Sequence, residues 1–111
     1  MSTKTAAITA VGAYVPDFIL SNQVLETMVD TNDEWITSRT GIKERRVLKG
    51  DGLGTSYLAI KAAQDLIKKS NLDPKEIDVV IVASTTPDMQ VAATAVYVAT
   101  QIGAVNAFAY D

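Results

Sequence analysis

Trp35 and Arg39 are the residues whose types and spacing most clearly suggest chemistry. They are four positions apart, so on a helix the indole ring and the guanidinium would face the same space. A flat aromatic ring beside a permanent positive charge suits a nucleotide, which has a flat base and phosphates. The alternative is that Trp35 packs into a neighbouring element and that Arg39 pairs with Glu34 or another carboxylate. Spacing alone favours this alternative.

Catalytic groups are scarce elsewhere in the chain. The sequence contains no cysteine and no histidine, which excludes thiol nucleophiles, imidazole bases and the usual zinc ligands, so we expect no metal site. No Ser-x-x-Lys spacing supplies a serine nucleophile with a lysine base. Thirteen carboxylates remain, but none is placed by the sequence in an obviously apolar pocket. The chain alone therefore carries no convincing catalytic constellation.

Composition limits the class of protein and its partners. With 111 residues, 48% of them apolar, the chain is expected to form a globular core. A net charge of −3 without a lysine and arginine stripe argues against nucleic acid or an anionic membrane as the main partner. No apolar run reaches the roughly 18 residues of a membrane span, and the N-terminus does not resemble a secretory signal. We therefore expect a cytoplasmic protein.

Strand and helix patterns alternate, which is typical of an α/β protein. Ser21 or Asn22 can cap a short helix, Thr31 and Glu34 have the spacing of a capping box, and Gly41 can end the second helix. The expected elements are a strand at 6–14, helices at 21–29 and 31–41, a loop at 43–54, a helix at Thr55–Ser70, a single turn beginning at Asp73-Pro74, a strand at 79–83, a helix at 92–102 and a strand at 105–111.

The unbroken Val/Ile run at 79–83 predicts a strand that is covered on both faces. Three strands and about four helices supply too few layers for such burial, so the sequence suggests a piece of a larger fold. The polar segment 84–88 follows this strand directly, where α/β proteins often place their chemistry. A simple polar turn is the favoured interpretation of that segment.

Several motifs follow one family in order and spacing. They are Gly12-Ala13-Tyr14-Val15-Pro16, Ser21-Asn22, residues 30–42 with Glu44-Arg45, residues 78–86, and Ala109-Tyr110-Asp111. Through them the chain resembles the first third of β-ketoacyl-acyl carrier protein synthase III, the initiating condensing enzyme of type II fatty acid synthesis. The resemblance implies that residues 1–111 form an N-terminal segment of a thiolase-like domain without an internal boundary. The implied fold is partial, a mixed sheet flanked by helices that is incomplete without further chain.

The resemblance also implies an activity. Members of the family catalyse a decarboxylative Claisen condensation, in which an acyl group moves from acyl-CoA to a cysteine and then to malonyl-acyl carrier protein. In the family a catalytic Cys, His and Asn carry the chemistry, and the resemblance implies that these three positions lie beyond the part of the family that this chain matches. The resemblance implies no cofactor, because acyl-CoA is a substrate. The other implied partners are malonyl-acyl carrier protein, the remainder of the synthase chain and a second copy of the protein in a homodimer.

Three residues take a role from the resemblance. Trp35 is expected to stack on the adenine of coenzyme A, Arg39 to contact its nucleotide or phosphate part, and Thr31 to lie beside the same moiety. The specific match reverses the preference that spacing alone gave for a structural role of Trp35 and Arg39.

Val91 marks a departure from the family pattern. A phenylalanine commonly stands there and reaches across the dimer interface to line the partner's acyl pocket. The smaller Val91 predicts either room for a bulkier or branched acyl group, or another residue that fills the space.

Two other functions stay open. One is a non-catalytic module of the same fold that binds coenzyme A or a protein partner. The other is a related thiolase-fold synthase of secondary metabolism, because enzymes that make quinolones, polyketides or long-chain ketones share this N-terminal pattern.

Overall fold

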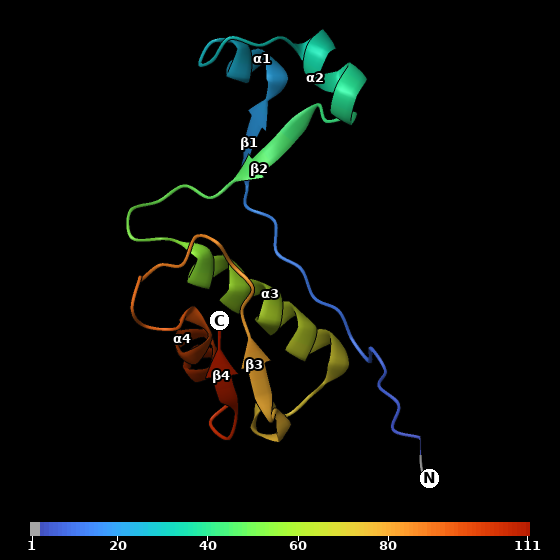
Figure 1. The fold of residues 1–111 in the computed structure, drawn as a ribbon, viewed down its shortest axis with the longest axis vertical. Helices are drawn as coiled ribbons and strands as arrows, with labels where there is room; N and C mark the ends of the chain where they lie inside the picture. Colours follow the sequence, from blue (N-terminus) through green and yellow to red (C-terminus); the bar gives the residue numbers. More distant parts are fainter. Residues whose placement is uncertain (1–2) are drawn as a thin grey trace. The chain divides into compact units, whose positions relative to one another are not determined.

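A computed structural model describes residues 3–111, and they fall into two compact units. One unit is Val15–Leu53, and the other combines the chain up to Tyr14 with Gly54–Asp111. The elements are β1 (Phe18–Ser21), α1 (Asn22–Glu26), α2 (Asp33–Thr40), β2 (Glu44–Val47), α3 (Thr55–Ser70), the 3-10 turn η1 (Pro74–Glu76), β3 (Val79–Ile81), α4 (Thr94–Ile102) and β4 (Phe108–Tyr110) (Figure 1). This mixture of helices and strands confirms the α/β class.

The unit Val15–Leu53 is built on an antiparallel strand pair. Phe18 of β1 lies opposite Val47 of β2, and Ser21 lies opposite Glu44. The Ser21 hydroxyl accepts a hydrogen bond from the Val24 amide at 3.3 Å, so the end of β1 leads directly into α1. Ile36 of α2 is buried and supplies the apolar part of this unit's core.

The second unit is built on a parallel strand pair, β3 and β4, with Val79 opposite Phe108 and Ile81 opposite Tyr110. Helix α4 contacts both strands and also α3 (Figure 1). The buried apolar residues are mostly small, which allows the helix to pack closely on its neighbours: Ala95, Val98, Ala99 and Ala104.

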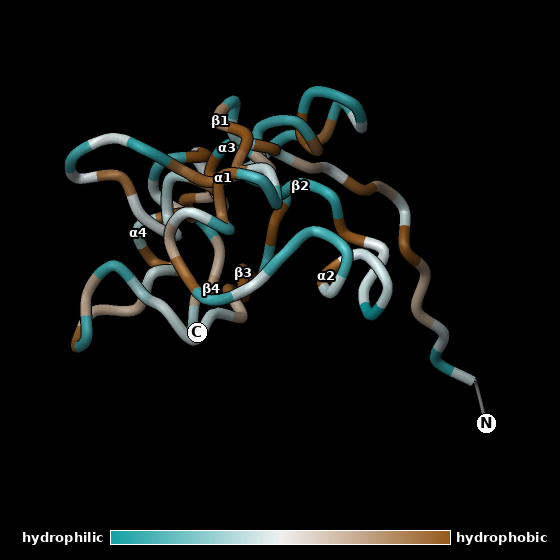
Figure 2. Tube along the Cα trace, turned by 90° about the horizontal axis from the view of Figure 1, so that it is seen from above, coloured by the Kyte–Doolittle hydropathy of each residue, from teal (hydrophilic) through white to brown (hydrophobic). Residues whose placement is uncertain are grey.

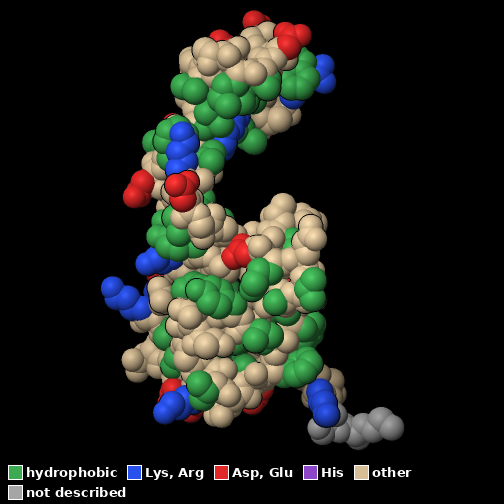
Figure 3. Space-filling view, turned by 90° about the vertical axis from the view of Figure 1, so that its left-hand side faces the viewer, with side chains coloured by type: hydrophobic (Ala, Val, Ile, Leu, Met, Phe, Trp, Pro, Cys, Tyr) green, Lys and Arg blue, Asp and Glu red, His purple; other side chains and the backbone are tan. Residues whose placement is uncertain are grey.

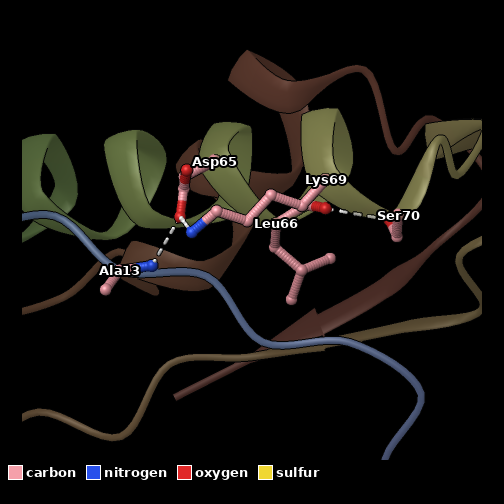
Figure 4. Close-up of polar contacts among 5 residues, drawn as sticks. All are labelled: Ala13, Asp65, Leu66, Lys69 and Ser70. Atoms are coloured by element: carbon pink, nitrogen blue, oxygen red, sulfur yellow. Dashed lines mark hydrogen bonds and ion pairs between the residues drawn. The ribbon is translucent and has the colours of Figure 1, made fainter.

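The N-terminal segment of this unit runs against α3. A Cβ at Gly12 would lie 2.5 Å from the backbone oxygen of Ala62, so only glycine permits this approach. The neighbouring Ala13 amide donates to Asp65 Oδ2 at 3.0 Å, and the same oxygen pairs with Lys69 Nζ at 2.6 Å (Figure 4). One carboxylate thus joins the segment to the helix.

Several predicted elements are confirmed. Helix α3 has the expected ends at Thr55 and Ser70, and α4 ends before a left-handed Gly103. Asp73 caps the single turn η1 by accepting from the Lys75 amide at 3.0 Å. Gly41 ends α2 in the left-handed conformation, with a φ of 71°.

The predicted strand at 6–14 is wrong. Apolar and paler residues follow one another along this segment (Figure 2), but it forms no strand, and Ile8 and Val11 are exposed. A strand needs a ladder of backbone hydrogen bonds, and no described strand pairs with these residues. The first strand is instead β1, beyond Pro16, and its partner β2 lies inside the expected loop 43–54.

Two further expectations need correction. The cap of α2 is Asn32, whose Oδ1 accepts from the Trp35 amide at 2.8 Å, and not Thr31 with a capping box. The strand at 79–83 is shorter, and one of its faces is open: Val79 is 49% and Ile81 58% exposed. Apolar side chains are visible at the surface of both units (Figure 3).

Candidate functional site

Trp35 and Arg39 form a stack on the outer side of α2. The Arg39 guanidinium carbon lies 4.8 Å from the centre of the Trp35 ring, as the spacing of four residues predicts. The Trp35 side chain is 53% exposed, and among residues 3–111 Arg39 forms no ion pair with a carboxylate. The structure therefore does not show the alternative pairing of Arg39 with Glu34. An aromatic surface and a cation lie together and open to solvent.

A hollow of about 240 Å³ lies at the start of α2. Its lining consists of Asp30, Thr31, Asn32 and Trp35. Thr31 and Trp35 thus border one space, while Arg39 lies one helical turn further along the helix over the Trp35 ring. The hollow combines polar side chains with an aromatic one, an arrangement that can hold a flat group bearing hydrogen-bonding atoms.

A buried amide lies behind this helix. Asn22 has no exposed surface, and its Nδ2 donates to Asp33 Oδ1 at 2.7 Å and to the Ile42 carbonyl at 2.8 Å. The hydrogen bonds from Asn22 and then from Thr37 lower the pKa of Asp33. The sequence predicts Asn22 as a possible helix cap and as part of the Ser21-Asn22 motif of the family. Neither pattern identifies its hydrogen-bond partners.

The segment after β3 serves a structural purpose. The Asp88 carboxylate accepts from the Ser56 amide at 3.2 and 3.1 Å, at the start of α3, where Gly54 offers no side chain as a cap. The Thr55 hydroxyl donates to the Thr86 carbonyl at 2.5 Å. The segment is thus a polar turn whose carboxylate accepts from one of the first amides of a helix.

The Asp111 side chain caps the N-terminal end of α4 in the same way. Its two carboxylate oxygens accept from the amides of Thr94 and Ala95, both at 2.7 Å. The Ala95 amide, and after it the Thr94 amide, lower the pKa of Asp111 because they stabilise its charged form. A carboxylate at a helix N-terminus also meets the positive end of the helix dipole.

Val91 is fully exposed and borders a second hollow, of about 380 Å³, in the unit that contains α4. Met89, Gln90 and Asp111 also line it. Val91 therefore belongs to a different unit from Trp35, Arg39 and Thr31.

Two kinds of feature are missing from residues 3–111. No group of three or more acidic, cysteine or histidine side chains is gathered as a metal site would require. None of the helices in this range combines the length and the apolar character needed to cross a membrane.

Comparison with known proteins gives a consistent result. No protein-family model matches the chain. The chain is 53% identical over 111 residues to the β-ketoacyl-[acyl-carrier-protein] synthase III of Phocaeicola vulgatus. This match covers the whole chain and 33% of that protein. The chain therefore spans about a third of the length of the curated relatives it matches.

Solved structures agree. The structure of β-ketoacyl-[acyl carrier protein] synthase III from Thermus thermophilus matches with a TM-score of 0.84 and 47% identity, over 96% of this chain and 32% of that one. The priming β-ketosynthase of the R1128 polyketide pathway matches with a TM-score of 0.85 and 33% identity, over 92% of this chain and 30% of that one. The likeness confirms the predicted partial thiolase-like fold.

Proposed function

We propose that this chain works as part of a condensing enzyme, because it matches about a third of the length of β-ketoacyl-[acyl-carrier-protein] synthases III. The reaction joins acyl-CoA to malonyl-acyl carrier protein with loss of carbon dioxide, which starts a fatty acid. The sequence has no cysteine or histidine. The nucleophile and the base therefore belong, in this proposal, to residues outside the printed sequence.

The contribution of this chain is to hold the nucleotide end of coenzyme A. The observation that carries this role is the open stack of Trp35 and Arg39 beside a hollow that Thr31 also lines. The indole offers a surface for the adenine, the guanidinium offers charged donors to a phosphate, and the Thr31 hydroxyl offers a hydrogen bond. These contacts lie far from the reacting carbonyl, so they supply binding energy and not chemistry.

Val91 takes a separate role in substrate choice. Its side chain is fully exposed at the edge of a hollow, and it is smaller than the phenylalanine common at this position in the family. A smaller side chain leaves room for a branched acyl group. We also propose that the complete synthase is a homodimer in the cytoplasm and that its reaction needs no cofactor.

A second candidate is a priming synthase of polyketide metabolism. The match to the R1128 priming β-ketosynthase favours it, because that enzyme shares the fold at 33% identity. Both candidates use the same proposed site for coenzyme A, and they differ in the acyl acceptor and product.

A fluorescence titration tests the binding role directly, because Trp35 is the only tryptophan of the chain. We expect coenzyme A to change Trp35 emission on binding, whereas pantetheine, which lacks the nucleotide, leaves it unchanged. Arg39→Ala should weaken the response to coenzyme A. Equal responses to both ligands, or no response to either, would overturn the assignment of the adenine to Trp35.

A further inference from the structure

One buried side chain connects both ends of the helix that carries the candidate site. Asn22 Nδ2 has two hydrogens, and its two short bonds go to Asp33 Oδ1 at 2.7 Å and to the Ile42 carbonyl at 2.8 Å. Asp33 is the first residue of α2, and Ile42 follows its cap Gly41. The exposed Trp35 and Arg39 lie between these two anchors.

The oxygen of the same amide ties the helix to the strand pair. Asn22 Oδ1 accepts from Arg45 Nη2 at 2.8 Å, and Arg45 Nη1 donates to the Leu20 carbonyl at 3.3 Å. The backbone N–H of Asn22 also donates to the Lys43 carbonyl at 3.0 Å. Asn22 thereby joins β1, β2 and both ends of α2 through one residue.

The buried side-chain amide of Asn22 must keep its position for all of its hydrogen bonds to form. Both polar atoms of the Asn22 side chain have partners, and removal of the side chain leaves a carboxylate, a carbonyl and a guanidinium each short of one bond. Thr37 Oγ1 donates to Asp33 Oδ1 at 3.1 Å, so one contact to the carboxylate survives but the link to Ile42 does not. Loss of Asn22 therefore frees the C-terminal end of α2 more than its start.

We propose that Asn22 is a positioning residue for nucleotide binding, which holds α2 at the angle that presents Trp35 and Arg39 together. This inference rests on the proposed coenzyme A role of these two residues. Asn22 has no exposed surface and so acts on the ligand only through the helix. Small displacements of a binding group can cost up to about a hundredfold in rate.

The test compares two substrates of the native protein that contains this sequence. Asn22→Ala should raise KM for acyl-CoA by about tenfold and leave KM for the matching acyl-pantetheine, which has no nucleotide, unchanged. Asn106→Ala is the control, because Asn106 Nδ2 also donates to a backbone carbonyl, that of Lys75 at 2.9 Å, but in the other unit. It should change neither KM.

If the alanine variant folds poorly, the side-chain groups of Asn22 and Asp33 can be exchanged instead. Asn22→Asp places two carboxylates together and should raise KM for acyl-CoA. Adding Asp33→Asn restores a donor and acceptor pair between positions 22 and 33, but not the bond to the Ile42 carbonyl, so it should lower that KM only in part. A KM that Asn22→Asp does not raise, or that the second change does not lower at all, would overturn the positioning role.

Other outcomes separate the two levels of the proposal. If Trp35→Ala weakens acyl-CoA binding and Asn22→Ala does not, the role of Asn22 is wrong and the nucleotide site stands. Equal rises in KM for acyl-CoA and acyl-pantetheine in Asn22→Ala also overturn it, because they indicate general structural damage. If Trp35→Ala itself has no effect, both the nucleotide site and the inference about Asn22 fall.

Discussion

At the level of single residues, Trp35 and Arg39 matter because they are stacked and also open. A tryptophan held in a core would offer no surface to a ligand, but half of this side chain is exposed and a guanidinium lies 4.8 Å from its ring centre. Arg39 without a carboxylate partner in the described chain keeps its donors for an anion. The stacking depends on the spacing of four residues on α2.

Replacement of Trp35 by alanine should raise KM for acyl-CoA more than it lowers kcat. Stacking of a base on an aromatic ring is worth about 1–3 kcal/mol, which corresponds to a change in affinity of roughly five- to 140-fold. Arg39→Ala should act in the same direction. Steady-state kinetics of the native protein measure both, with Tyr97→Ala as a control that removes another half-exposed ring. An unchanged KM in Trp35→Ala and Arg39→Ala would contradict the role.

Substitution at Val91 should alter the choice of acyl group. Because Val91 is fully exposed at a hollow, Val91→Phe adds volume there without displacing a packed core. We expect the ratio of kcat/KM for branched acyl-CoA to that for acetyl-CoA to fall in this variant. A strict preference of the unmodified protein for acetyl-CoA would count against the prediction.

At the level of elements, two helices depend on carboxylates that arrive from distant segments. Asp88 serves the start of α3, and Asp111 serves the start of α4. Neither helix has a side-chain cap of its own at Gly54 or Ala93. The loop after β3 and the end of β4 thereby stabilise the starts of these two helices.

Asp111→Asn should destabilise the fold near neutral pH, and the effect should depend on pH. The pKa of Asp111 is lowered in the folded chain, so its carboxylate stabilises the fold above the unfolded-state pKa of about 3.9. That stabilisation is lost as the pH falls through the still lower pKa of the folded state. Thermal unfolding between pH 7 and pH 3 should show the wild type and the variant converging at the acidic end.

Asp51→Asn provides the control, because no described residue forms a hydrogen bond or ion pair with the Asp51 side chain. It should leave the pH dependence unchanged. A constant difference between wild type and Asp111→Asn over the whole pH range would contradict the capping role.

Gly12→Ala should weaken the attachment of the N-terminal segment to α3. The added Cβ would lie 2.5 Å from the backbone at both Ala62 and Leu66, which cannot move aside as a flexible side chain would. Overpacking of this kind costs about 1–3 kcal/mol, measurable by denaturant unfolding. Ala6→Val adds volume at an exposed position of the same segment and should have little effect. Equal stability of Gly12→Ala and wild type would show that the segment does not pack this closely.

The same elements show what sequence could predict. Helix α3 was predicted to the residue because its apolar positions recur every three or four residues and Asn71 stops it in the left-handed conformation. The closeness of Trp35 and Arg39 follows from their spacing, whereas the coenzyme A role of Thr31, Trp35 and Arg39 comes from the resemblance and stays a prediction. Strands β1 and β2 were missed because short strands are defined by their partners, and Phe18 meets Val47 across 29 residues of chain. The partners of Asn22 are equally distant in sequence, so no local pattern indicates them.

At the level of the whole molecule, the parallel pair β3–β4 carries a sequence suited to burial but keeps apolar side chains exposed. Ile81 is 58% and Phe108 69% exposed, whereas parallel strands are normally covered on both faces. The proposed role as part of a synthase explains this mismatch, because the relatives are about three times as long as this chain and have further residues to cover it.

The most direct test of the central claim is a condensation assay on the native protein that contains this sequence. Acetyl-CoA or a branched acyl-CoA is supplied with malonyl-acyl carrier protein, and the mass of the carrier protein product is measured. We expect a β-ketoacyl-acyl carrier protein to form, and Trp35→Ala to need a higher acyl-CoA concentration for the same rate. Absence of this product with every acyl-CoA tested would contradict the assignment to a condensing enzyme.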